Sequence, residues 1–227
     1  FTTWGTQFFW PFEYRVAFKN IFVIDPLYTL PFLFFLILTM FQKRTSPKRR
    51  FYNRLGLIVS SSYLVLTLIL KGVTYGKFTD SLEEQNIAYN QIQTKPAPLN
   101  SILWYANVET EDAFLIGDYS LFDSQPIVFH SFPKNHHLLG DWIDKPNIKR
   151  LKKITENGWF TISEKNGELF FNDLRFGLLN NDPENPEFAF SYLLTEKEGI
   201  IYAEETEKNR EDAQELLGDL WERIKGN

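Results

Sequence analysis

The chemistry open to this chain is limited first by the residues that it lacks. Its 227 residues include no cysteine, which excludes disulfides, thiolate metal sites and cysteine nucleophiles. The three histidines, His130, His136 and His137, do not stand at the spacing of a helical metal-binding motif. A metal site of His136 with Asp141 is one interpretation, and the pattern favours a polar surface loop. No stretch has the form of a phosphate-binding glycine loop or of a nucleophile elbow.

Asp25 is the residue with the clearest chemical alternatives. It is the only charged residue in the apolar stretch 21–41, and Pro26 follows it. An Asp at the N-cap with Pro at the first helical position is an ordinary helix start. An ionisable residue within a membrane-spanning segment is also a functional candidate by default. Both interpretations stay open at this point, a cap or a site residue at the outer membrane boundary.

Arg175 is a candidate anion-binding residue. It stands between apolar neighbours in the run 173–177, Asp-Leu-Arg-Phe-Gly, at the end of an expected strand. A structural salt bridge is the alternative, and the pattern favours it over an anion clamp.

The elements that must position these residues divide by charge. Residues 1–76 carry nine Lys and Arg against two acids, whereas residues 77–227 carry 15 against 27. The larger part would repel phosphates, so nucleic-acid binding is excluded. Aromatic residues make up 17% of the chain. They supply enough apolar surface for a buried core, so intrinsic disorder is not expected.

Two apolar stretches predict a transmembrane helical hairpin over residues 21–75. Residues 21–41 are long enough to cross the hydrocarbon core, and residues 55–70 are extended by Lys71 and Tyr75 at the interface. The loop between them, 42–54, holds six basic residues and no acid, which predicts a cytoplasmic loop. A buried hairpin of a soluble protein is the alternative. Localisation in the cytoplasmic (inner) membrane follows, with the large C-terminal domain extracytoplasmic and the lipid bilayer as a partner.

The remaining sequence predicts an aromatic interfacial segment, a linker and a folded domain. Residues 1–20 have the composition of a membrane-interface belt and lack the features of a signal peptide. We interpret the chain as the C-terminal part of a longer protein. Residues 76–98 are expected to form a linker, and 99–227 an extracytoplasmic α+β domain. The domain is expected to hold one antiparallel sheet of about five to seven strands and a C-terminal helix. The expected strands are 102–109, 113–122, 127–132, 159–163, 168–173, 188–194 and 200–204, with helices at 146–156 and 210–224.

Three parts of the sequence resemble a known family. The run 2–7 (Thr-Thr-Trp-Gly-Thr-Gln), the Trp-Pro-Phe of 10–12 and the Asp-Pro of 25–26 resemble the YdjM-like membrane-bound metal-dependent hydrolases. These are also described as LexA-binding, inner-membrane-associated hydrolases. The runs 104–105, 119–123 and 174–177 are similar to an extended version of the family with an extra C-terminal domain.

The resemblance implies a divalent metal, with zinc as the default, bound largely outside this chain. The family's His and Asp clusters lie on helices that would precede Phe1, and those helices of the same protein are an implied partner. Thr3 and Gly5 match positions that shape the loop near the site. Asp25 is implied to be a ligand, an orienting residue or a cap. Binding to LexA would need a cytoplasmic surface, whereas the charge pattern places the domain outside.

The leading hypothesis is the C-terminal part of a membrane-bound, metal-dependent hydrolase. Its domain would cap the site or select the substrate, and we expect this chain to be inactive on its own. The alternative is a non-catalytic, membrane-tethered binding or assembly domain. Neither hypothesis names a substrate.

Overall fold

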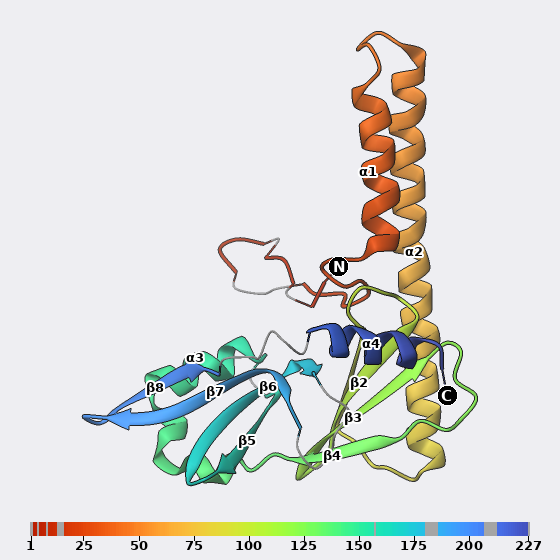
Figure 1. Cartoon of the computed structure of the whole chain (residues 1–227). Coiled ribbons are helices and arrows are strands. Elements are labelled where there is room, and N and C mark those ends of the chain that lie inside the picture. Colours follow the sequence, from red (N-terminus) through yellow and green to blue (C-terminus); the bar gives the residue numbers. More distant parts are fainter. Residues whose placement is uncertain are drawn as a thin grey trace.

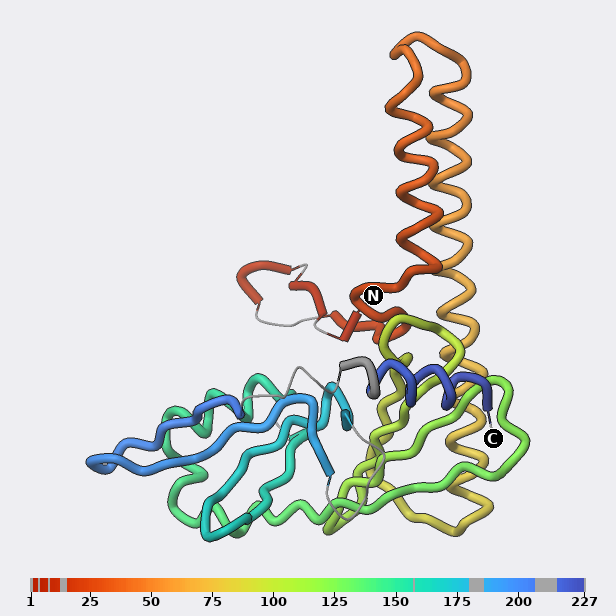
Figure 2. Tube along the Cα trace, viewed as in Figure 1, coloured from red at the N-terminus to blue at the C-terminus, as the bar shows by residue number. Residues whose placement is uncertain are grey.

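The structure is a computed structural model with an α+β architecture. It describes residues 2–3, 5–7, 9–12, 16–156, 158–179, 186–206 and 213–226, with side chains of the last range described from 216. A pair of antiparallel helices projects from a domain of two four-stranded antiparallel sheets and a final helix (Figure 1). The trace in Figure 2 shows the hairpin rising from one side of the domain, with the two sheets side by side beneath it.

The helix pair consists of α1 (Pro26–Met40) and α2 (Pro47–Glu84). Within the described residues, α2 is the one helix long and apolar enough to cross a membrane, and α1 is a shorter apolar helix. The expected stretch 21–41 is helical only from Pro26, because Asp25 caps the helix there. Close packing of the pair requires Gly56, where an added Cβ would lie 2.8 Å from the Cβ of Phe35.

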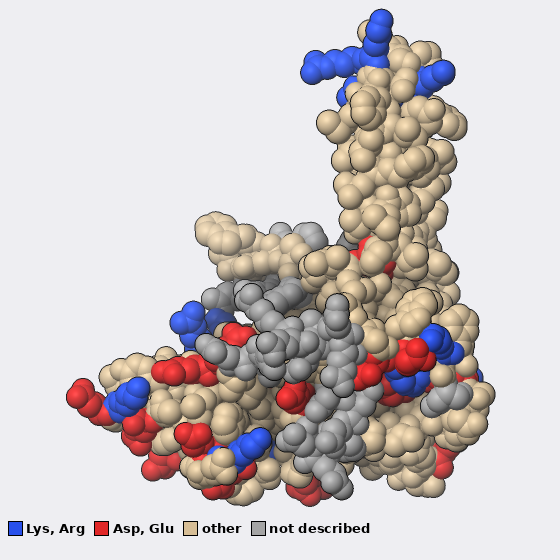
Figure 3. Space-filling model, viewed as in Figure 1, with Lys and Arg blue, Asp and Glu red and all other residues tan. Residues whose placement is uncertain are grey.

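The charges of the hairpin separate its two ends. Figure 3 shows basic side chains gathered at the tip, where the loop 42–54 lies, and a long uncharged surface between this tip and the domain. Acidic side chains appear mainly on the domain. This distribution matches the charge division of the sequence.

The prediction that residues 76–98 form a linker is wrong. The helix α2 continues to Glu84, and residues 91–96 form the strand β1 (Gln91–Pro96). Phe78 and Leu82 are fully buried against the first sheet, so this turn of helix is a core element of the domain. Burial of these two apolar side chains extends the helix beyond the membrane stretch and leaves no linker.

The first sheet has the order β1-β2-β3-β4. It comprises β1, β2 (Leu103–Glu109), β3 (Ala113–Ser120) and β4 (Phe129–Pro133). One face packs on α2 around Trp104, Ala106 and Val108. The opposite face holds the alternate residues, because successive side chains of a strand point to opposite sides.

The second sheet has the order β5-β6-β7-β8 and a core of its own. Its strands are β5 (Phe160–Lys165), β6 (Glu168–Leu178), β7 (Phe188–Lys197) and β8 (Ile200–Glu205). The 3₁₀ segment η1 (His136–Asp144) and the helix α3 (Pro146–Ile154) cover one of its faces. The buried residues of this core are Leu139, Ile148, Leu151, Phe160, Ile162, Phe171, Leu194 and Ile201.

The predicted single sheet is therefore wrong, although the predicted strands are largely confirmed. The hairpins β2–β3, β5–β6 and β7–β8 form as expected. The division arises because η1 and α3 follow β4 and bury the face of the second sheet. Six buried residues fill the space between the sheets: Phe114, Ile116, Phe132, Trp159, Leu174 and Phe188. The last helix, α4 (Ala213–Ile224), packs on the first sheet through Leu220 and Ile224.

Candidate functional site

Asp25 lies at the joint between the helix pair and the domain. Its Oδ1 accepts hydrogen bonds from the backbone N–H of Leu27 (2.9 Å) and Tyr28 (3.3 Å), which confirms the predicted cap. Its Oδ2 accepts from the Tyr63 hydroxyl of α2 (2.8 Å) and the Ser101 hydroxyl before β2 (3.0 Å). The residue is only 1% exposed. One carboxylate therefore joins α1, α2 and the first sheet.

The number of hydrogen-bond donors around Asp25 shows whether its carboxylate has room for a metal ion. A carboxylate has about four acceptor positions, and four donors already approach this one. In the described ranges, no three His, Asp or Glu residues form a group that could hold a metal. The described residues do not fit a metal centre by themselves. A metal held by residues upstream of Phe1 stays a prediction.

Thr3 and Gly5 lie in the segment that precedes the hairpin. Gly5 has φ 69°, a conformation that residues with a Cβ rarely adopt, and this agrees with a loop-shaping position. Thr6 pairs with Val16 in an isolated antiparallel bridge next to it. No hydrogen bond between described residues brings Thr3 or Gly5 to Asp25. Their catalytic role stays a prediction.

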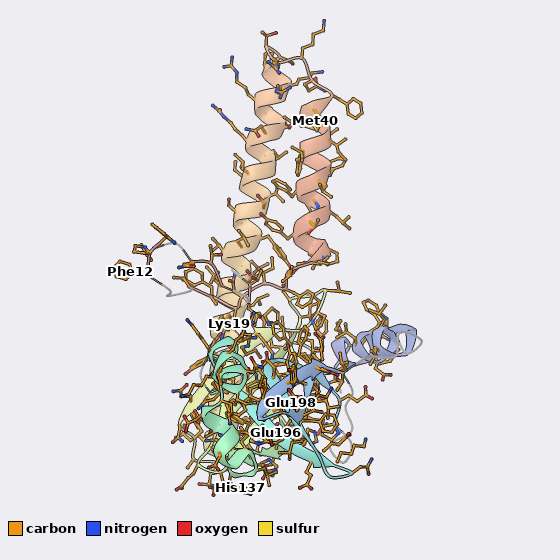
Figure 4. All side chains as sticks on the ribbon, turned by 90° about the vertical axis from the view of Figure 1, so that its left-hand side faces the viewer. Phe12, Lys19, Met40, His137, Glu196 and Glu198 are labelled. Atoms are coloured by element: carbon orange, nitrogen blue, oxygen red, sulfur yellow. The ribbon has the colours of Figure 1, made fainter. Side chains whose placement is uncertain are left out.

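Lysine side chains complete the joint next to Asp25. Lys71 of α2 donates to the carbonyl oxygens of Lys19 (3.2 Å) and Thr94 (2.9 Å). Lys19 donates to Gln93 Oε1 (2.6 Å) and forms an ion pair with Glu156 (2.9 Å). Figure 4 shows Lys19 at the base of the hairpin, where the domain begins. These contacts tie the approach to α1 to both sheets.

Arg175 lies on β6 where the two sheets meet. Its guanidinium pairs with Asp173 (Nη2–Oδ2 2.7 Å), and both side chains are buried. This is the structural salt bridge that the sequence pattern favours, and an anion-binding role stays a prediction. Lys95 of β1 donates to the carbonyl oxygens of Leu174 (3.2 Å) and Arg175 (2.5 Å). Burial lowers the pKa of the Lys95 amine to about 7.

The three histidines have different surroundings in the structure. His136 stacks on the Phe160 ring, its Nε2 lies 2.8 Å from the Phe160 carbonyl oxygen, and burial lowers its pKa. His137 is exposed at the end of the domain away from the hairpin (Figure 4). Asp141 is also exposed, so the polar surface interpretation fits both residues. His130 belongs to a different feature.

A cavity of about 210 Å³ lies on the face of the first sheet that is turned away from α2. Its lining residues are Tyr105, Ile116, Gly117, Asp118, His130, Phe132, Leu178 and Arg223. These come from all three regions that meet here: β2–β4, the end of β6, and α4. The lining combines apolar side chains with a phenol, an imidazole and an ion pair. Apolar lining with a few polar groups is the composition of small-molecule sites, and the volume of this cavity limits the ligand to a small one.

Arg223 of α4 supplies the positive charge in the cavity lining. Its guanidinium pairs with Asp118 (2.8 Å) and Asp123 (2.6 Å), and these hydrogen bonds raise its pKa. Burial, followed by the neighbouring Asp118 charge, raises the pKa of Tyr105 to about 12. The Tyr105 hydroxyl is therefore a neutral donor at physiological pH. No sequence motif predicts this cavity, because its residues are up to 118 positions apart in the chain.

Comparisons with known proteins do not add to this geometry. No family model, no curated protein and no solved structure matches the chain. The resemblance to the YdjM-like hydrolases therefore rests on the sequence runs alone.

Proposed function

We propose that this chain is the membrane-anchoring and substrate-selecting part of a membrane-bound, metal-dependent hydrolase of the YdjM-like kind. In this proposal, the metal ligands are the His and Asp clusters that the resemblance places upstream of Phe1. The described residues are assigned no catalytic step. Their role is to hold the domain over the outer end of the hairpin, where it caps the site and selects the substrate.

The joint around Asp25 is the observation that carries the proposal. A domain on a flexible linker would sample many positions above the membrane. Here the carboxylate of Asp25 accepts bonds from α2 and from the loop before β2, and Lys71 binds the backbone of β1. These contacts hold the domain in one position relative to the hairpin, which supports a capping role at the proposed membrane boundary.

The basic loop 42–54 sets the proposed orientation. Short loops rich in Lys and Arg remain on the cytoplasmic side, so the domain at the other end of the hairpin is placed outside. The helix α2 is long enough to connect the two sides without interruption.

Cysteine labelling of the intact membrane tests the anchoring and the orientation. The chain has no cysteine of its own, so Asn166→Cys in the β5–β6 turn and Thr45→Cys in the basic loop each supply a single thiol. A membrane-impermeant maleimide added from outside should label position 166 and leave position 45 unlabelled until the membrane is permeabilised. The reverse pattern would overturn the orientation, and labelling of both positions would overturn the membrane span.

Metal analysis of the intact protein that contains this chain tests the hydrolase class. We expect stoichiometric metal, removed by a chelator together with hydrolytic activity. Protein that folds, lacks metal and is not activated by added zinc would overturn the class.

The cavity beside α4 favours a second function, a non-catalytic membrane-tethered binding domain. Its volume fits a small ligand with an apolar body and a hydrogen-bonding end group, such as the probe benzyl alcohol. Leu178→Trp would fill the cavity, whereas Ile154→Trp places the same side chain at an exposed position. Chemical shift changes on adding benzyl alcohol should vanish only in the first variant. Identical responses in both variants would exclude the cavity as the binding site.

A further inference from the structure

We propose that α4 lies on the outer leaflet of the bilayer and forms a second membrane contact through Leu217 and Trp221. The proposal rests on the membrane anchoring proposed above and adds a lipid-binding surface to it. With this contact, the domain would be held to the membrane at two points, the hairpin and a helix parallel to the surface.

The first step is that the apolar face of α4 is wider than its contact with the domain. Leu220 and Ile224 pack against Ala97 and Leu103 of the domain. Along the edge of the same face, Leu217 is 53% exposed and Trp221 is 62% exposed. These two are four residues apart, so they are neighbours on one face of the helix. Among the described residues nothing covers this pair, which makes it a candidate contact surface.

The chemistry of this face is that of a membrane interface. Tryptophan is enriched at headgroup depth, and lysine beside it extends its charge toward water. The Lys225 amine lies 6.0 Å from the centre of the Trp221 ring and pairs with Glu222. A helix with such an exposed edge can lie in the interface plane, with Leu217 and Trp221 turned toward the lipid.

The position of α4 is set by a chain of contacts that begins on the hairpin. The uncharged stretch of α2 from 55 to 70 ends at Lys71, and its 16 residues cover about 24 Å. The Lys71 amine binds the Thr94 carbonyl oxygen of β1. Ala97, just after β1, packs against Ile224 of α4. The helix α4 therefore lies near the level at which the uncharged surface of the hairpin ends.

The views of the whole molecule agree with this position. Figures 1 and 2 show α4 on the side of the domain from which the hairpin rises, running across the hairpin axis. Phe9, Trp10 and Phe12 are exposed, and Figure 4 shows Phe12 at the level of the lower end of the hairpin. Because α4 and these aromatic side chains lie on the side of the domain that faces the proposed membrane, a lipid surface is the occupant that we infer. Asp219 and Glu222 make a zwitterionic lipid a better match than an anionic one.

Spin labels on single cysteines of the full chain test the proposal in phosphatidylcholine nanodiscs. Leu217→Cys and Trp221→Cys place the label on the proposed contact. Asp219→Cys is the matched control, because two residues along a helix turn the side chain about 200° to the opposite side. Leu33→Cys, on the exposed surface of α1, reports the lipid, and Asn166→Cys reports water.

The measured quantity is the collision rate of each label with oxygen, which concentrates in lipid, relative to a water-soluble nickel chelate. We expect positions 217 and 221 to show a severalfold higher ratio than positions 219 and 166. Equal ratios at 217, 219, 221 and 166, with position 33 in lipid, would overturn this proposal and leave the anchoring intact. An aqueous ratio at position 33 would instead overturn the anchoring. Spin–spin broadening at 221 would assign the face to a second copy and overturn lipid docking.

Discussion

The two sheets of the domain obtain their cores in different ways. The second sheet is covered by η1 and α3, which are its neighbours in the chain, and its core contains no residue of the hairpin. The first sheet packs on Phe78 and Leu82 of α2, the helix that also crosses the proposed membrane span. The two sheets share the buried cluster between them. On its other face the second sheet is covered by its own neighbours in the chain, whereas the first sheet is covered by the end of α2. Folding of the first sheet and placement of the hairpin are thus one event.

The largest expected effect comes from removing the shared element. A chain that begins at residue 99 lacks α2 and the edge strand β1, so the first sheet loses one core face and six residues of pairing. We expect slow amide exchange in β5–β8 and fast exchange in β2–β4. Slow exchange in β2–β4 would show that this sheet does not depend on α2.

A matched pair of substitutions makes the same comparison in the full chain. Phe78→Ala and Phe171→Ala each remove a fully buried phenyl ring, and each should cost about 3–5 kcal/mol. Phe78→Ala should raise amide exchange in the first sheet, and Phe171→Ala in the second. Equal exchange patterns for the two variants would contradict separate cores.

Substitutions of Asp25 test the hydrogen bonds that join the helix pair to the first sheet. Asp25→Ala removes the cap of α1 and leaves the Tyr63 and Ser101 hydroxyls without this acceptor, at a cost of roughly 2–4 kcal/mol. Asp25→Asn keeps an oxygen for the cap, and the hydroxyls can rotate to accept from the amide, so its cost should stay below about 1 kcal/mol. Denaturation of both variants in detergent gives the two values. A large cost for Asn with loss of metal from the intact protein would instead favour the functional interpretation of Asp25.

Lys95 connects the two sheets, and its lowered pKa predicts that the free energy of unfolding depends on pH. Its folded-state pKa of about 7 is below its unfolded value, so between pH 7 and 9 the unfolded chain binds more protons. Stability should therefore rise by about 2 kcal/mol over this interval. Lys95→Met, which cannot be protonated, should lack this rise when the two proteins are compared at each pH. Parallel curves for the two proteins would exclude a neutral Lys95.

The smallest effects concern ion pairs. Glu156→Gln removes the partner of Lys19 at the joint, whose lysine is 10% exposed, and should cost about 0.5–1 kcal/mol. Lys149→Met removes an exposed pair with Asp144 on α3, and its cost should be within 0.3 kcal/mol, roughly the value of a surface pair. Thermal melts of the two variants at low salt and at 1 M salt measure the two costs. A larger cost for Lys149→Met would contradict the ranking by burial.

The sequence predicts elements better than their arrangement. Alternating apolar residues and Gly-containing turns locate seven of the eight strands, and Asp25-Pro26 locates the start of α1. The strand β1 is missed because Thr94 and Lys95 are polar, and they are buried only through contacts with α2 and β6. The polar residues 83–86 likewise conceal that α2 continues as far as Glu84.

The candidate sites depend still more on distant contacts. The cap at Asp25 follows from local spacing, but its partners Tyr63 and Ser101 are 38 and 76 residues away. The Asp118–Arg223 pair spans 105 residues and depends on where α4 packs. Spacing in the chain cannot indicate such pairs, because they form only when both sheets and α4 are in place.

In the proposed membrane, the uninterrupted course of α2 would make the domain respond to the thickness of the bilayer. No break separates Pro47 from Glu84, and the last turns of the helix are fixed in the core of the first sheet. When a spanning helix meets a thinner bilayer, it tilts to keep its apolar length in the hydrocarbon. Here the helix and the first sheet would tilt as one lever. The angle between this sheet and the plane of the proposed membrane would then depend on the lipid composition.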